Sequence, residues 1–151
     1  MVTQARAQGE ALEVRRTFAA SPQRVFDAWT RPEALKSWAA PGAMTAPVVE
    51  VDLRVGGGYR IHMSAPDGKE HRVIGVYREV DPPRRLVYTW TWETNPDVTD
   101  SIVTVEFHDR GTSTEVVLRH EKLPSAESRD RHTVGWEGCF DKLETVVTAA
   151  A

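Results

Sequence analysis

The feature that most constrains this fold is a long amphipathic segment near the C-terminal end. Ser125 is suited to cap the start of a helix, and Glu127 is an acidic residue in its first turn. Beyond them, mainly apolar residues recur every three or four positions, which predicts one helix about six turns long. Its stripe consists of His132, Gly135, Trp136, Cys139, Phe140, Leu143, Val146 and Val147. A long helix that follows all the predicted strands must bury such a stripe against a sheet.

The middle of the chain alternates apolar and polar residues in short runs, which is typical of strands with one buried face. We predict strands over residues 12–18, 48–51, 59–63, 71–80, 86–92, 103–107 and 116–120. The inward face of the 71–80 strand stays ambiguous. Turn sequences such as Pro66-Asp67-Gly68 connect consecutive strands and favour an antiparallel meander. Gly56-Gly57-Gly58 is interpreted as a turn or bulge, because a strand and not a helix follows it.

Two short helices are predicted between the first and second strands. Ser21 and Pro22 are typical of a helix start, Pro32 begins a second helix, and Pro41-Gly42 stops it. The apolar faces of these helices carry Val25, Phe26, Trp29, Leu35 and Trp38. The predicted fold class is therefore α+β: a helix-grip arrangement in which a curved antiparallel sheet of about seven strands surrounds the long C-terminal helix.

The length of 151 residues fits one domain. We expect this domain over residues 11–148, with a flexible N-terminal arm over 1–10 and a frayed C-terminus over 149–151. The single cysteine, Cys139, cannot form an internal disulfide, and a reducing cytoplasm is the expected location.

The charge distribution gives no reason to expect nucleic acid or a membrane as a partner. The net charge is −3, and the basic pairs Arg15-Arg16 and Arg84-Arg85 are isolated. Adjacent strand residues point to opposite faces, so neither pair forms a basic stripe. We expect both pairs to lie on the solvated surface.

Two glycines inside the predicted C-terminal helix bear on how it meets the sheet. Gly135 and Gly138 each cost the helix about 1 kcal/mol relative to alanine. A glycine kept in a helix either lets the backbone approach a neighbour closely or leaves room beside the helix, and both can hold together. A strongly curved sheet cannot be filled along its whole length by one helix, so we expect a tapered apolar pocket between them.

Residues able to carry catalysis or bind a metal are scattered along the chain. There is no His-x-x-x-His spacing and no Gly-x-Ser-x-Gly motif, so we expect no metal site, no cofactor and no catalytic set. Cys139 is expected to be a buried small hydrophobic residue. His120 and His132 lie on apolar faces, where each is either a satisfied core residue or a ligand anchor, acid or base. Aromatic residues with polar atoms that could orient a ligand are Tyr59, Tyr88, Trp90 and Trp92.

Four segments form a recognisable pattern over nearly the whole chain. In order, they are Phe18-x-x-x-Pro22-x-x-Val25-Phe26-x-x-Trp29-Thr30-x-Pro32-x-x-Leu35-x-x-Trp38, Gly57-Gly58-Tyr59-Arg60, Gly75-x-Tyr77-x-Glu79-Val80-x-Pro82-Pro83-x-Arg85-Leu86, and Gly135-Trp136-x-x-Cys139-Phe140-x-x-Leu143. Each segment alone is weakly specific. Taken together and in order, they resemble the heat shock protein 90 ATPase activator homologue domains of the START-like, Bet v 1-like (SRPBCC) superfamily.

The resemblance implies a helix-grip fold with a hydrophobic cavity, but no single activity. Three functions stay open: a binding domain for an apolar or aromatic small molecule, which is the leading hypothesis, a cyclase-type or hydrolase-type enzyme on an aromatic or polyketide-like substrate, and a protein-interaction module that contacts a chaperone. The protein would be a monomer or a homodimer. The predicted pocket residues are Trp29, Trp38, Tyr59, Ile61, Met63, Tyr88, Trp90, His120, His132, Gly135, Trp136, Cys139 and Phe140.

Overall fold

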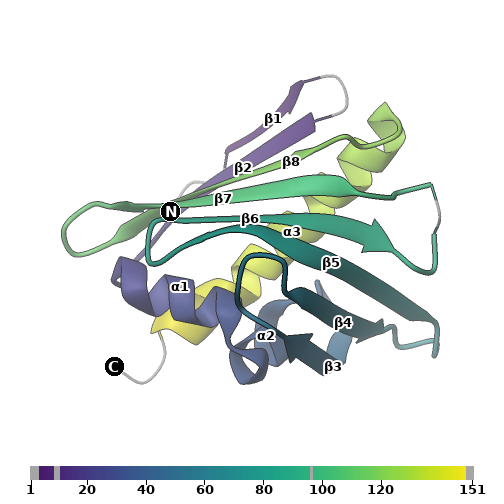
Figure 1. The fold of residues 1–151 in the computed structure, drawn as a ribbon, viewed down its shortest axis with the longest axis horizontal. Helices are drawn as coiled ribbons and strands as arrows, with labels where there is room; N and C mark the ends of the chain where they lie inside the picture. Colours follow the sequence, from purple (N-terminus) through teal and green to yellow (C-terminus); the bar gives the residue numbers. More distant parts are fainter. Residues whose placement is uncertain (1–3, 9–10, 96, 149–151) are drawn as a thin grey trace.

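One curved antiparallel sheet surrounds a long helix. The computed structural model describes residues 4–8, 11–95 and 97–148. In this part, the helices are α1 (Pro22–Thr30), α2 (Pro32–Trp38) and α3 (Ala126–Thr148), and the sheet bends around α3 (Figure 1). The strands are β1 (Gln4–Gln8), β2 (Ala11–Phe18), β3 (Thr45–Val51), β4 (Gly58–Ser64), β5 (Glu70–Asp81), β6 (Arg85–Trp92), β7 (Ser101–Asp109) and β8 (Thr114–Glu121).

The strand order confirms the predicted α+β helix-grip fold. Strands lie side by side in the order β1-β2-β8-β7-β6-β5-β4-β3, and β3 to β8 form the predicted meander. Helices α1 and α2 carry the chain from β2 to β3 at the far edge of the sheet (Figure 1). The meander then returns to place β8 beside β2, so the sheet curves around α3.

The N-terminal segment differs from its prediction. The sequence predicts a loose arm over residues 1–10, yet Gln4–Gln8 forms β1, which pairs in antiparallel register with β2 from Gln4↔Arg15 to Gln8↔Ala11. This pairing uses the backbone N–H and C=O groups that β2 would otherwise leave free at the sheet edge. A pattern of apolar side chains cannot predict such backbone pairing. The remaining residues of the predicted arm, and the predicted frayed end over 149–151, lie outside the described residues.

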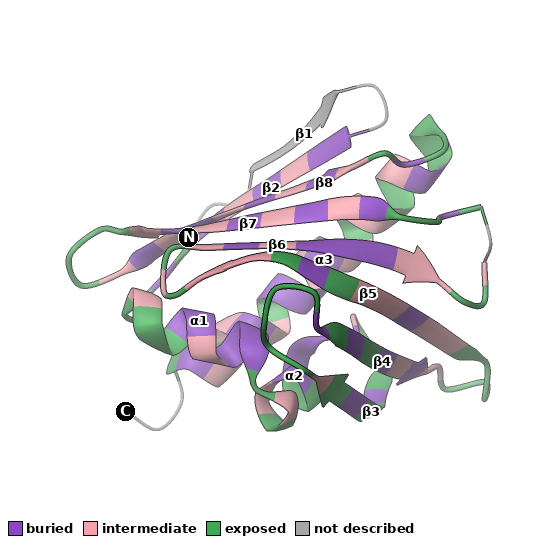
Figure 2. Ribbon diagram, in the orientation of Figure 1, coloured by how far each residue is buried: buried purple, intermediate pink, exposed green. Residues whose placement is uncertain are grey.

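The sheet buries one face and exposes the other to solvent. In β7 the residues Val103, Val105 and Phe107 are buried, whereas the residues between them are half-buried (Figure 2). This is the alternation that the sequence predicts for a strand with one face on a core. The buried residues of strands β2 to β8 form one hydrophobic cluster with those of α1, α2 and α3.

Helices α1 and α2 are fixed by local signals and then by packing. The Ser21 hydroxyl accepts a hydrogen bond from the Arg24 backbone N–H at 3.2 Å, and Pro22 occupies the first turn of α1. The indole N–H of Trp38 donates to the Ala28 backbone oxygen at 2.8 Å, which joins α2 to α1. These contacts hold Trp29 and Trp38 together, with their ring centroids 4.7 Å apart.

One arginine is buried that the sequence places on the surface. Arg16 is only 7% exposed, and its guanidinium forms ion pairs with Asp141 at 2.9 Å and Glu144 at 3.7 Å on α3. Its Cζ atom lies 5.8 Å from the ring centroid of Phe140. The surface prediction is therefore wrong for Arg16, because this residue shares the inner face of β2 with its apolar neighbours two positions away.

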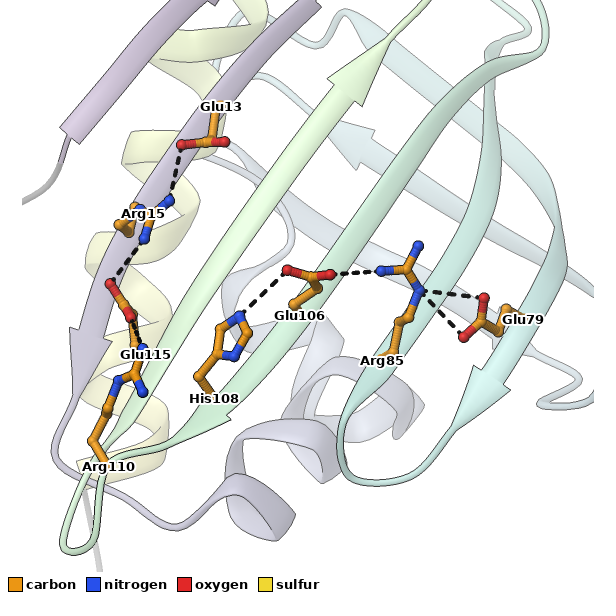
Figure 3. Close-up of polar contacts among 8 residues, drawn as sticks. All are labelled: Glu13, Arg15, Glu79, Arg85, Glu106, His108, Arg110 and Glu115. Atoms are coloured by element: carbon orange, nitrogen blue, oxygen red, sulfur yellow. Dashed lines mark hydrogen bonds and ion pairs between the residues drawn. The ribbon is translucent and has the colours of Figure 1, made fainter.

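The outer face of the sheet is covered by alternating charges. Two chains of ion pairs cross it, Glu13–Arg15–Glu115–Arg110 and Glu79–Arg85–Glu106–His108 (Figure 3). The hydrogen bond from Arg110, with a further contribution from Arg15, lowers the pKa of Glu115 below its ordinary value. Surface ion pairs of this kind generally contribute little to stability.

Candidate functional site

A cavity of about 470 Å³ lies between the N-terminal half of α3 and the inner face of β4, β5 and β6. Helices α1 and α2 and the loop over residues 39–44 close it on one side. Residues 94–95, after β6, and Arg131 lie on the opposite side. This volume is in the range of small-molecule sites, which are usually concave and mainly apolar.

Most of the predicted pocket residues are found on the wall of this cavity. Eleven of the thirteen line it: Trp29, Trp38, Tyr59, Ile61, Met63, Tyr88, Trp90, His132, Gly135, Trp136 and Cys139. The α3 stripe and the alternation along β4 and β6 bring these residues together. Their contact with a ligand stays a prediction.

The other two predicted residues, Phe140 and His120, lie in the core outside the cavity wall. Phe140 is fully buried, and its ring centroid lies 5.7 Å from those of Phe18 and Trp29. His120 is also fully buried, in contact with the rings of Trp90 and Trp136. Both are therefore placed to support the wall rather than to form it.

Sequence reasoning did not assign several wall residues to the pocket, among them Pro41, Tyr77 and Arg131, whereas Trp92, named as a residue that could orient a ligand, does line it. Tyr77 could have been found by alternation along β5. Its inward face was ambiguous because the register of β5 against β6 shifts between Tyr77 and Glu79. Pro41 lies in a loop, and no local sequence pattern predicts how that loop runs along the cavity.

The two glycines of α3 have different roles. A Cβ atom added at Gly138 would lie 2.9 Å from the Cβ of Pro41, so this glycine permits close packing against the loop over residues 39–44. A Cβ atom added at Gly135 would meet no atom within 4 Å, and Gly135 lines the cavity. Of the two interpretations drawn from the sequence, close backbone approach therefore holds at Gly138 and room beside the helix holds at Gly135.

A lysine fastens the same loop to α3. The Nζ atom of Lys142 donates to the backbone oxygens of Ala40 at 2.5 Å and Met44 at 3.0 Å. Because Ala39, Pro41 and Met44 line the cavity, this lysine fixes one of its walls.

Another glycine makes room for a tyrosine at the sheet. A Cβ atom at Gly75 would lie 2.4 Å from the Tyr59 ring and 2.0 Å from the Thr89 backbone oxygen. Tyr59 crosses this position and donates its hydroxyl to that oxygen at 2.6 Å. The Val76 backbone N–H instead donates to the Thr89 hydroxyl at 2.9 Å. Gly75 is thus required where the Tyr59 side chain crosses β5 to reach β6.

Three tyrosine rings form a cluster in the wall. The centroids of Tyr59, Tyr77 and Tyr88 are separated by 5.3 to 5.9 Å. Burial raises the pKa of all three phenols above the ordinary value, and that of Tyr59 well above it. The phenols are therefore neutral at physiological pH and can donate hydrogen bonds.

His132 is held in one neutral form. The Trp92 indole N–H donates to its Nε2 atom at 2.9 Å, so Nδ1 carries the proton and donates to the Ser128 backbone oxygen at 2.7 Å. Burial lowers the pKa of His132, although the hydrogen bond to Ser128 opposes this effect. Both ring nitrogens are engaged within the protein.

His120 is held in the opposite tautomer. The Trp136 indole N–H donates to its Nδ1 atom at 3.2 Å, so Nε2 carries the proton and bonds the Ser101 hydroxyl at 2.9 Å. That hydroxyl donates to the Trp90 backbone oxygen at 2.7 Å. Burial lowers the pKa of His120 well below its ordinary value, and the nearby His132 adds to the shift.

Most indole donors in the wall are already used. Trp29 donates to the Tyr88 hydroxyl at 3.2 Å, and Trp38, Trp92 and Trp136 have the partners given above. Among the described residues, only the Trp90 indole N–H is a buried side-chain polar atom without a hydrogen-bond partner. Its neighbours are aromatic rings, with the Trp92 centroid at 5.4 Å and the Trp136 centroid at 5.1 Å.

The cavity carries little charge. Of its described lining residues, only Arg131 has a permanent charge, and its guanidinium pairs with Glu127 at 2.9 Å outside the cavity. Burial raises the pKa of Cys139 to about 12, so its thiol stays protonated at neutral pH. In the part of the chain that the structure describes, no three His, Cys, Asp or Glu side chains are grouped closely enough to hold a metal ion. None of the described helices has the length and apolar character needed to cross a membrane.

Comparisons with known proteins agree with this architecture. Protein CV1439 from Chromobacterium violaceum is 27% identical, with a TM-score of 0.87, and the match covers 93% of this chain and 99% of that one. The AHSA1 protein from Silicibacter pomeroyi is 26% identical, with a TM-score of 0.80, and the match covers 89% and 95%. An AHSA1-like protein from Aeromonas hydrophila has the same fold at 24% identity, with a TM-score of 0.73 and coverage of 91% and 92%.

A comparison with curated proteins gave no match. The family model for Activator of Hsp90 ATPase homolog 1-like proteins matches residues 19–148, which is most of the chain and includes every element from α1 to α3. The chain therefore belongs to the Activator of Hsp90 ATPase homolog 1-like family, with the helix-grip fold of the SRPBCC superfamily.

Proposed function

We propose that this protein binds an apolar or aromatic small molecule in the cavity between α3 and the sheet. The observation that carries this proposal is a cavity of about 470 Å³ walled mainly by aromatic and aliphatic side chains. A ligand that binds here removes apolar surface from water, which favours binding by about 25 cal/mol for each Å² buried.

The hydrogen bonds of the wall support binding rather than acid–base catalysis. A general base needs an accessible lone pair within reach of the substrate. His132 lines the cavity, but its Nε2 lone pair accepts from Trp92 and its Nδ1 proton is donated to Ser128. No cavity-lining carboxylate is found among the described residues. A chaperone partner, and the choice between monomer and homodimer, stay predictions from the resemblance.

The proposal is tested with a neutral apolar fluorophore, N-phenyl-1-naphthylamine. Titration into the wild-type protein should give a saturable rise in fluorescence with a stoichiometry of one. In the Gly135→Leu variant the new side chain enters the cavity, and the rise should be lost. This substitution does not clash at Cβ, and leucine favours a helix more than glycine does.

Val134→Leu is the matched control, because Val134 is the neighbouring residue on α3 and is 70% exposed. This variant should bind as the wild type does. Circular dichroism should show that both variants are folded. A wild-type protein without saturable binding, or equal binding by Gly135→Leu, would contradict the proposed function.

A further inference from the structure

The three tyrosines of the cavity wall use their hydroxyls differently. Tyr59 donates its proton to the Thr89 backbone oxygen at 2.6 Å. The oxygen of Tyr88 accepts the Trp29 indole N–H at 3.2 Å, so the Tyr88 proton is left for another acceptor. No acceptor for it is found among the described residues, and the Tyr77 hydroxyl has no hydrogen-bond partner among them.

The two available hydroxyls belong to neighbouring residues on adjacent strands. Tyr77 of β5 pairs with Tyr88 of β6, and their ring centroids lie 5.9 Å apart. Both residues line the cavity and are buried, with exposures of 4% and 6%. Among the described residues the Trp90 indole nitrogen is the one enclosed side-chain polar atom without a partner, so the Tyr77 hydroxyl is not sealed off and an acceptor in the cavity can reach it.

The contact from Trp29 makes Tyr88 the better donor of the two. A hydroxyl whose oxygen accepts a hydrogen bond is polarised and donates its own proton more strongly. Trp29 is itself fixed by packing against Trp38 and Phe107, with centroid distances of 4.7 and 5.5 Å. The chain Trp29 to Tyr88 to ligand is therefore directed into the cavity from a rigid part of the core.

We propose that the cavity selects aromatic ligands that carry a hydrogen-bond acceptor, such as a ketone oxygen, and that the hydroxyls of Tyr77 and Tyr88 bind this acceptor. The inference rests on the proposed function and names the chemical class of its ligand. The hydroxyl hydrogens present positive ends of dipoles to the ligand, which favours a carbonyl or phenolate oxygen over an ammonium group.

The test compares fluorene with 9-fluorenone, which have nearly the same shape and differ by one carbonyl oxygen. Isothermal titration calorimetry on the wild-type protein should give an affinity for fluorenone about tenfold above that for fluorene, the ratio expected from one or two buried neutral hydrogen bonds. Tyr88→Phe and Tyr77→Phe should each reduce this ratio to about threefold or less, and the double variant should bring it to about one. Fluorene affinity should change little, since the rings remain.

Tyr59→Phe is the matched control. This tyrosine also lines the cavity, but its hydroxyl is already bound to Thr89, so the ratio should stay within about twofold of the wild-type value. Thermal unfolding should establish that every variant is folded at the temperature of the titration.

The outcomes separate the two proposals. Wild-type binding of both ligands with a ratio near one would overturn the acceptor assignment and leave the binding function in place. A loss of the ratio in Tyr59→Phe equal to that in Tyr88→Phe would overturn it as well. Failure of both ligands to bind the wild-type protein would overturn the binding function itself, and this inference with it.

Discussion

The space under α3 is filled at one end and hollow at the other, although aromatic residues dominate both. At the filled end, Phe26 lies against Phe107 with centroids 5.4 Å apart, and Phe18 lies against Phe140 at 5.7 Å. At the hollow end, tyrosines, tryptophans and His132 surround the cavity. The amount of aromatic surface therefore does not decide whether the interior closes.

The difference lies in the polar atoms of the rings. Phenylalanine has none, so the rings at the filled end are free to interlock until they touch. At the hollow end, Tyr59 is bound to Thr89, Trp92 to His132, and Trp136 to His120. Moving any of these rings into the cavity would break a buried hydrogen bond, at a cost of about 1 to 3 kcal/mol. The hydrogen bonds of the wall thus keep the cavity from collapsing.

The largest expected effect comes from truncating a ring at the filled end. Phe140→Ala should lower the free energy of unfolding by about 3 to 5 kcal/mol, because it removes a fully buried ring that touches Phe18 and Trp29. Met63→Ala, on the cavity wall, should cost less than about 2 kcal/mol, since one side of Met63 already faces open space. Urea unfolding measures both values. Equal losses would remove the distinction between the two ends.

Acid should destabilise the hollow end. The pKa values of His120 and His132 are lowered in the folded protein, mainly by burial, so these residues gain protons more readily in the unfolded chain. Stability is therefore complete above the unfolded histidine pKa of about 6.5, and it falls as the pH drops below this value, by up to about 1.4 kcal/mol per pH unit for each histidine.

Urea unfolding at several pH values between 7 and 5 measures this dependence. In this range the unfolded carboxylates are still largely ionised, so histidine titration dominates the slope. His120→Gln should reduce the slope of the unfolding free energy against pH by about half. A free energy of unfolding that stays constant from pH 7 to pH 5 would contradict the assignment of buried neutral histidines.

The smallest expected effects come from the two glycines of α3, and they have opposite signs. Gly138→Ala should destabilise by about 1 to 3 kcal/mol, because its Cβ would lie 2.9 Å from the Cβ of Pro41. Gly135→Ala should stabilise by about 0.5 to 1 kcal/mol, because its Cβ meets nothing and alanine favours a helix. Thermal unfolding distinguishes them. Shifts of the same sign would show that both positions contact a neighbour, or that neither does.

Much of this architecture could be predicted from local patterns. The stripe of α3, the alternation along β6 and the helix starts at Pro22 and Pro32 each depend on neighbouring residues in the chain, so the sequence reports them directly. The same patterns bring Tyr59, Tyr88 and Trp136 to one cavity.

The remaining features depend on long-range contacts. Strand β1 adds to the edge of β2 through its backbone, and the register shift after Tyr77 hides the inward face of β5. The buried position of Arg16 is understood only when Asp141 on α3 is placed opposite it. The bonding of each tyrosine hydroxyl likewise depends on partners that lie on other strands and helices.

The two hydrogen bonds of Lys142 restrict the side from which a ligand can enter the cavity. They join the loop over residues 39–44 to α3, so that side of the cavity can open only if buried backbone oxygens lose a charged donor. On the opposite side, Thr94 and Arg131 are exposed and no such tie joins residues 94–95 to α3 among the described contacts. The Trp92–His132 hydrogen bond joins the end of β6 to α3, so a path between solvent and cavity on that side lies beyond this bond, between residues 94–95 and Arg131.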